Sequence, residues 1–137
     1  MIAFMICITA LDMFNYPDRQ EAYSVCEAVV IESERENVDP ALAVALAHHE
    51  SGLRRFAVSR VGALGPLQVI PRYYPKDMPR NTRGMIRAGL QILKFRLKTN
   101  TTEVDAIAKY NGGNKPGKRS YRWAKSVVVL ARKLRGE

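Results

Sequence analysis

The chain has 137 residues, of which 47% are hydrophobic, and a formal net charge of +9. This length and composition can bury one core, which excludes a disordered polymer and a small scaffold that depends on several disulfides or a metal. The basic excess favours polyanionic partners (nucleic acid, an anionic membrane surface or an acidic cell-wall polymer) without choosing among them. No repeat or flexible linker divides the chain, so we expect a single domain over residues 1–137.

The N-terminal segment is apolar from Met1 to Leu11. It lacks a basic beginning, and Asp12 follows too early for a segment that spans a bilayer. We therefore expect neither an export signal nor stable membrane insertion. Phe4, Ile8 and Leu11 stand at the spacing of one helical face, which predicts a helix docked through these three side chains.

Residues that could bind a metal are few. Cys7 and Cys26 are too few for a disulfide scaffold and lack the spacing of metal ligands, so reduced packing residues are expected rather than a bridge. His48 and His49 are adjacent, and adjacent helical residues point about 100° apart. The sequence therefore predicts no metal site and no cofactor.

Apolar residues at helical spacing predict most of the remaining secondary structure. We expect a helix from Pro17 to about Asn37, then a central helix that Asp39 caps and that runs from Pro40 to Glu50. Gly52 is placed to end the central helix in a left-handed conformation. Further helices are expected from Asn81 or Thr82 to about Leu97, from Thr102 to about Asn111, and from Tyr121 to Leu134, with Trp123 in the core.

The chain between Leu53 and Asn81 is rich in proline and follows no sustained helical period. It is expected to form an irregular loop or short strands, and functional residues are common in such segments. Tyr73 and Tyr74 within it are candidates either for stacking on sugar rings or for packing against the loop.

Glu50 is the candidate catalytic residue. A carboxylate at the end of an apolar helix is partly desolvated and lies near the negative end of the helix dipole, and both effects favour the protonated form. A carboxylic acid that keeps its proton near neutral pH can donate it to a leaving glycosidic oxygen. Position alone leaves a solvated surface glutamate open as the alternative.

Three separated motifs extend this interpretation. They are Glu50-Ser51-Gly52 with Ser59 in the following loop, Gly62-Ala63-Leu64-Gly65-Pro66-Leu67-Gln68, and Ala108-Lys109-Tyr110-Asn111-Gly112-Gly113. With the helix from Met85 to Leu97, the chain resembles the soluble lytic transglycosylase family of murein-degrading enzymes over about residues 38–132. One such motif is weak, whereas three in the right order make a specific signal.

The resemblance implies a mainly α, single lysozyme-like domain of the goose-type lysozyme kind, with an irregular loop or small β region after the catalytic helix. It implies cleavage of the β-1,4 bond between N-acetylmuramic acid and N-acetylglucosamine, with Glu50 as sole general acid and base and 1,6-anhydro-muropeptides as products. Ser59 and Gln68 would orient the N-acetyl group and hydroxyls, Tyr110 would hydrogen-bond Glu50, and Asn111 would hold a sugar or the loop. For Gln68 and Asn111, bonds that only stabilise the loop are the alternative.

A second carboxylate, which most glycosidases use, is not apparent. Asp77 lies in the proline-rich loop and Asp105 at a helix start, where a solvated capping role is expected. The mechanism that the resemblance implies needs no second acid, because the substrate's N-acetyl group assists and its 6-hydroxyl attacks. Lys109 departs from the family pattern of a small or neutral residue, which predicts a cationic contact to substrate.

Other functions stay open. A hydrolytic muramidase or a catalytically silent sugar-binding domain would use the same fold. A basic nucleic-acid-binding module would explain the cluster at Lys115, Lys118, Arg119, Arg122 and Lys125 but not Glu50, Gln68 and Tyr110, so no nucleic acid is expected as partner. We expect a monomer that binds peptidoglycan strands in the periplasm or cell wall, as a phage virion or lysis protein or as a bacterial remodelling enzyme.

Overall fold

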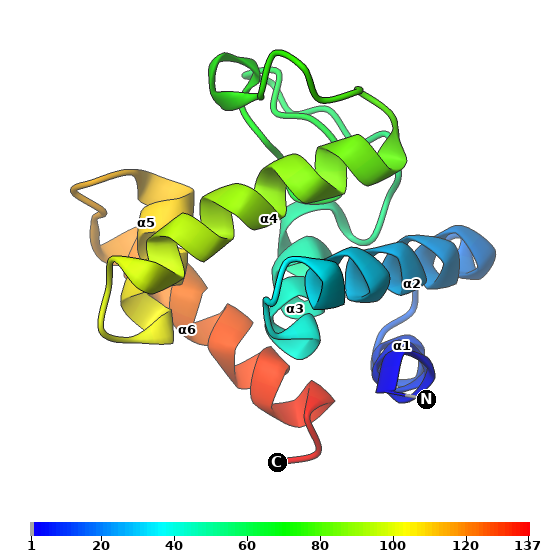
Figure 1. Cartoon of the computed structure of the whole chain (residues 1–137). Helices are drawn as coiled ribbons and strands as arrows, with labels where there is room; N and C mark the ends of the chain where they lie inside the picture. Colours follow the sequence, from blue (N-terminus) through cyan, green and yellow to red (C-terminus); the bar gives the residue numbers. More distant parts are fainter. Residues whose placement is uncertain (1) are drawn as a thin grey trace.

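The computed structural model describes the chain from Ile2 to Glu137 (Figure 1). Over these residues the fold is mainly α, as predicted, and the expected small β region is reduced to isolated bridges from Leu64 to Val58 and Val69. The helices are α1 (Ile2–Met13), α2 (Arg19–Arg35), α3 (Pro40–Ser51), the short 3-10 helix η1 (Pro71–Tyr73), α4 (Thr82–Lys98), α5 (Glu103–Gly112) and α6 (Lys118–Leu134).

The central helix is α3, and its ends form as the sequence predicts. The side chain of Asp39 accepts a hydrogen bond from the Ala41 N–H, and Pro40 occupies the first turn. Gly52 ends the helix with a φ of 64°, and its N–H donates to the His48 carbonyl. The residues between these ends are apolar and buried on every side up to Ala47, which makes α3 the centre of the core.

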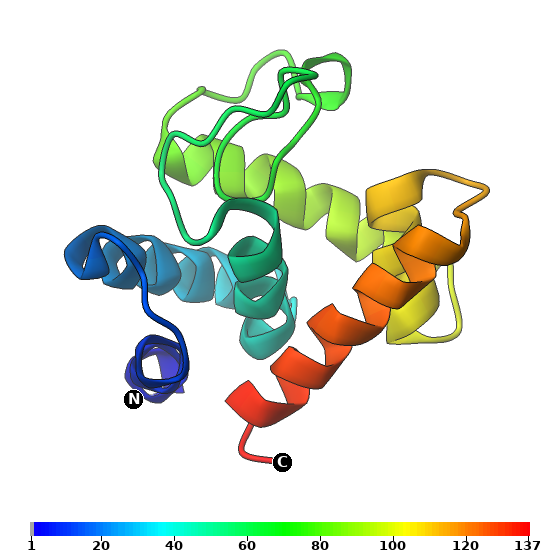
Figure 2. The same cartoon turned by 180° about the vertical axis from the view of Figure 1, so that it is seen from behind.

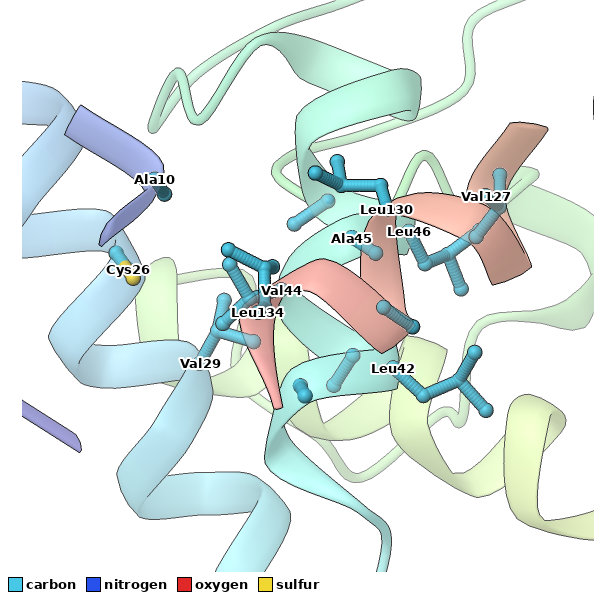
Figure 3. Packing of buried hydrophobic residues seen from close by; sticks show 14 of the residues in the cluster. Ala10, Cys26, Val29, Leu42, Val44, Ala45, Leu46, Val127, Leu130 and Leu134 are labelled. Atoms are coloured by element: carbon cyan, nitrogen blue, oxygen red, sulfur yellow. The ribbon is translucent and has the colours of Figure 1, made fainter. Parts of the chain in front are cut away.

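Two other helices enclose α3. Figure 3 shows Leu42, Val44, Ala45 and Leu46 of α3 among side chains of α2 and α6. The contributed side chains include Val29 from α2 and Val127, Leu130 and Leu134 from α6. Because α3 is held from several directions, its C-terminal turn has a fixed position, and Glu50 stands on that turn.

The loop 53–81 forms a second, smaller lobe with α4. Figures 1 and 2 both place this loop over α4 and beyond the C-terminal end of α3. A separate apolar cluster of Val69, Tyr74, Met85 and Ala88 holds the loop on α4. The opposite stripe of α4, which includes Ile86 and Leu90, enters the main core as predicted. The C-terminal end of α3 therefore lies between the main core and the smaller lobe.

The N-terminal helix α1 forms and docks as predicted, but through a different face. Phe4 is 55% exposed and Ile8 37% exposed, whereas Cys7 and Ala10 are buried. The predicted docking stripe is therefore wrong except at Leu11, which is buried. Every helix within residues 2–137 is too short or too polar to cross a membrane.

Cys7 and Cys26 form a disulfide, so the expectation of reduced cysteines is wrong. Their Cα atoms are 5.8 Å apart, within the range that a bridge requires. The bond joins α1 to α2 and explains why the Cys7 face of α1 is the docked one. Sequence spacing could not reveal this pairing, because it depends on how the two helices cross. Disulfides persist in oxidising compartments.

Removing the disulfide is expected to destabilise the fold. For a bridge between residues 19 apart, the Cys7→Ala/Cys26→Ala variant should lose about 3 kcal/mol in the free energy of unfolding, since the unfolded chain regains the entropy of an open loop. Urea unfolding of the variant and of the reduced wild type measures this, and both should shift to lower urea by similar amounts. Equal midpoints for oxidised wild type and variant would contradict the prediction.

Candidate active site

A cleft of about 840 Å³ lies where the end of α3 meets the loop lobe, α4 and α5. Its lining includes all five residues that the motifs single out: Glu50, Ser59, Gln68, Tyr110 and Asn111. They come from three segments that are up to 61 positions apart in the chain, between Glu50 and Asn111. The fold thus brings the three motifs to one cavity.

Glu50 is only partly accessible at the base of this cleft. Burial raises the pKa of its carboxyl from 4.5 to about 8. The carboxyl is therefore mostly protonated at pH 7, in the state that a general acid needs. The solvated surface glutamate that position alone left open does not fit this environment.

Glu50 is the only carboxyl group among the residues that line the cleft, within the described part of the chain. Asp77 is exposed in the loop, and Asp105 is the residue whose N–H donates to Thr102 at the start of α5. Neither lines the cleft. The described lining of the cleft therefore presents one acid, Glu50.

Tyr110 lies close to Glu50 but does not hydrogen-bond it. Its hydroxyl donates to the backbone carbonyl of Leu67 at 2.6 Å, so the predicted bond to Glu50 is wrong. A phenol has one proton to give, and the loop carbonyl receives it. Burial and the negative charge of an ionised Glu50 raise the pKa of Tyr110 well above its usual value of 10.0. Tyr110 thus fixes the loop beside the acid.

Gln68 and Ser59 brace the loop from inside the cleft. The Gln68 amide nitrogen donates to the carbonyls of Ala57 and Gly65 at 3.0 and 2.9 Å, and the Ser59 hydroxyl oxygen accepts from the Ala63 N–H at 3.1 Å. These bonds match the loop-stabilising alternative for Gln68. The Gln68 oxygen and the Ser59 hydroxyl proton have no partner within residues 2–137, so each remains available to a ligand.

Asn111 ties two helices together at the rim. Its side-chain oxygen accepts from the Ser120 hydroxyl at 2.8 Å, which links the end of α5 to the first turns of α6. This bond is the structural alternative considered for Asn111. Its amide nitrogen has no partner among the described residues, and Asn111 is one of the residues that line the same cleft.

The sequence profile of the transglycosylase SLT domain matches residues 27–127, well over half of the chain. The chain belongs to this family. The match begins in α2, ends in α6 and contains all three motifs. The predicted family and the predicted lysozyme-like helical fold are therefore confirmed. This family acts on cell-wall peptidoglycan. No curated protein matches the chain.

In this SLT domain the two histidines before Glu50 stay uncharged near neutral pH. Burial, with a smaller contribution from His49, lowers the pKa of His48 to about 4, and burial lowers that of His49. The His48 ring stacks on Phe14 at 3.9 Å between centroids, and its Nδ1 lies 2.7 Å from the Tyr16 hydroxyl. Neutral neighbours leave the protonated state of Glu50 undisturbed.

The SLT domain cleft also contains residues that the motifs did not single out. The helix α4 presents Gln91 and Phe95, one turn apart, and Arg96 beside them. Of the two loop tyrosines, Tyr73 is exposed in the cleft, while Tyr74 is buried and donates to the Pro79 carbonyl. The one signal in the sequence that could have indicated Phe95 is an aromatic residue on the solvent-facing side of an amphipathic helix.

Replacing Tyr110 with phenylalanine should weaken both fold and activity. The variant leaves the Leu67 carbonyl without its donor, which should lower the free energy of unfolding by about 1–2 kcal/mol. Peptidoglycan cleavage should fall only partially, since the ring still packs beside Glu50. Urea unfolding and turbidity loss measure the two effects. Tyr23→Phe on α2 is the matched control, because its hydroxyl has no side-chain partner within residues 2–137. Equal losses in both variants would contradict this role.

Proposed function

We propose that this SLT domain is a lytic transglycosylase that cleaves the β-1,4 bond between N-acetylmuramic acid and N-acetylglucosamine and releases 1,6-anhydro-muropeptides. The observation that carries the proposal is the single protonated carboxyl of Glu50 in a cleft whose described lining has no second acid. Hydrolysis through two carboxylates requires a partner that this lining lacks.

In the first step Glu50 donates its proton to the bridging oxygen as the bond from muramic C1 to that oxygen breaks. The oxygen of the substrate's own N-acetyl group supports the positive charge that develops at C1. In the second step the Glu50 carboxylate takes the proton of the muramic 6-hydroxyl, and the oxygen of that hydroxyl bonds to C1. The proton returns to Glu50, no water is consumed, and the acid is ready for another cycle.

The neighbouring groups suit these steps. The free Ser59 hydroxyl proton and the free Gln68 oxygen are a donor and an acceptor for the N-acetyl group and sugar hydroxyls. Tyr110, by holding Leu67, keeps the loop at a fixed distance from Glu50. The partial burial that raises the pKa of Glu50 also limits water near C1, which favours attack by the internal hydroxyl.

Product mass tests this mechanism. Purified peptidoglycan digested with the protein should give muropeptides one water lighter than reducing-end products. Products with a reducing muramic end would establish a hydrolytic muramidase instead. Peptidoglycan that binds the protein but stays uncleaved would establish a silent sugar-binding domain.

We also propose that the protein works outside the cytoplasm, in the periplasm or the cell wall. The disulfide between Cys7 and Cys26 requires oxidising conditions, and the peptidoglycan substrate lies outside the cytoplasm. Action from a phage virion or as a phage lysis protein, and a monomeric state, stay predictions.

A further inference from the structure

Three cations line the active-site cleft together with Glu50. They are Arg72 next to Tyr73, Arg96 at the end of α4, and Lys109 on α5. Glu50 keeps its proton at neutral pH, so it does not offset their charge. The cleft is therefore cationic, although an uncharged glycan backbone needs no cations for its recognition.

Neutral groups hold two of these cations in place. Arg96 donates to the side-chain oxygen of Asn114 at 2.9 Å, and Lys109 donates to that of Asn100 at 2.7 Å. A neutral acceptor orients a cation without cancelling its charge. Within residues 2–137, no carboxylate lies within 4.0 Å of Arg72, Arg96 or Lys109.

Four arginines outside the cleft are paired with acids. The buried carboxylate of Glu32 has Arg35, Arg83 and Arg87 within 3.9 Å, and Arg135 contacts both Asp39 and Glu103. Except for Arg35 and Glu32, which both lie on α2, these pairs join separate parts of the fold. The three cleft cations have no such acid partner, and their gathering in one cleft beside Glu50 points to an anionic ligand.

Two of the cleft cations stand beside exposed aromatic rings. The Arg72 guanidinium lies 4.9 Å from the Tyr73 ring centroid, and that of Arg96 lies 5.9 Å from the Phe95 centroid. Tyr73 is 57% and Phe95 58% exposed, and both line the cleft. An exposed ring can stack on the apolar face of a sugar, while the neighbouring cation meets a charged group on the same sugar.

We propose that Arg72, Arg96 and Lys109 bind carboxylates carried by the muramic residues, so that the cleft selects glycan strands with acidic substituents over neutral strands. The inference rests on the proposed function for the identity of the glycan. Two sources supply such carboxylates: the lactyl group of muramic acid and the stem peptide attached to it. Guanidinium and ammonium groups bind both through charge-assisted hydrogen bonds.

Binding to three soluble strands of equal length tests the proposal. One carries stem peptides, one is stripped to the free lactyl carboxylate, and one is stripped with that carboxylate converted to a neutral amide. The probe protein is the Glu50→Gln variant, which should not cleave the strands. We expect about tenfold tighter binding of at least one acidic strand than of the amide strand, as charge-assisted bonds contribute about 1.5 kcal/mol or more.

Cation variants on the same background decide whether the cleft is responsible. Arg96→Gln/Lys109→Gln should lose most of the preference for acidic strands. The matched control Arg132→Gln/Lys133→Gln removes the same charge from exposed positions on α6 outside the cleft and should keep it. Equal urea midpoints of the variants would show that the fold is intact.

The outcomes separate cleanly. A preference for the peptide strand alone assigns the stem peptide as the source, a preference for the free-lactyl strand alone assigns the lactyl group, and a preference for both means that the cleft accepts either carboxylate. Equal binding of all three strands overturns the proposal, and so does an equal loss of the preference for acidic strands in the cleft variant and its control. Competition by DNA, at a phosphate concentration equal to the carboxylate concentration of the strands, overturns it as well. Failure of the wild type to cleave any strand would refute the proposed function, while the binding ratios would still judge this inference.

Discussion

Replacing Glu50 with glutamine should abolish peptidoglycan cleavage and leave substrate binding intact. The amide has nearly the same shape as the acid but cannot donate an acidic proton in the first step or accept one in the second. General acid–base catalysis contributes about 10²–10⁴-fold, and one residue serves both steps here, so the loss should lie at the upper end. Turbidity of purified peptidoglycan measures the rate and sedimentation with it measures binding. Activity within tenfold of wild type would overturn the assignment.

The same substitution should stabilise the protein at high pH. The pKa of Glu50 is about 8 in the folded chain against 4.5 ordinarily, so the folded state holds the proton more tightly. The stability linked to this proton is fully present below pH 4.5 and is lost as pH rises through 8. At pH 9, Glu50→Gln should therefore be more stable than wild type by about 1–3 kcal/mol, allowing for partial solvent access.

Urea unfolding at pH 4 and pH 9 checks this sign, and the gain should appear only at the higher pH. Glu27→Gln, at an exposed position on α2, is the matched control and should show no such difference. The cleavage rate of wild type should likewise fall as pH rises through about 8, because the acid form is lost. A glutamine variant less stable than wild type at pH 9 would contradict the burial argument.

Replacing Gly89 with alanine should have the second large effect. In the middle of a helix this change ordinarily stabilises by about 0.5–1 kcal/mol. At Gly89, a Cβ atom would stand 2.5 Å from the Leu67 Cβ and 3.1 Å from the Tyr110 hydroxyl. The variant should instead lose about 1–3 kcal/mol through overpacking, and α4 should move away from Leu67.

Activity should suffer more than stability in this variant. The displaced groups are the two partners of the hydrogen bond that fixes the loop beside Glu50. A displacement of about 1 Å at such a site can reduce the rate about a hundredfold. Gly117→Ala is the control, since a Cβ there meets nothing within 4 Å. Unchanged urea midpoint and cleavage rate in Gly89→Ala would show that the contact has no such role.

Much of the helical architecture could be predicted because local signals and packing agree. Asp39, Asn81 and Thr102 each accept a hydrogen bond from the first turn of the helix they precede, as their residue types predict. The predicted start of α6 at Tyr121 was wrong. The helix begins at Lys118, after Gly117, which has no side chain to cap it. Without a side-chain cap, the sequence gives no local mark for that boundary.

Long-range geometry explains what could not be predicted. The docking face of α1 depends on the bond between Cys7 and Cys26, and no periodicity in α1 contains that information. The motifs correctly indicate which residues meet in the cleft, but not that the Tyr110 hydroxyl reaches Leu67 rather than Glu50. Of the cleft cations, the sequence indicated Lys109 as a contact to substrate but did not single out Arg72 and Arg96, because Arg96 has the local pattern of an ordinary solvent-facing arginine.

Titration of the Glu50 carboxyl by NMR is the most direct test of the central claim. With the side-chain carboxyl carbon of Glu50 labelled and assigned by its absence in Glu50→Gln, its chemical shift is followed between pH 3 and pH 10. We predict a midpoint near 8 in the free protein. A midpoint near the ordinary value of 4.5 would mean that Glu50 is ionised at neutral pH, and the single-acid mechanism would fail.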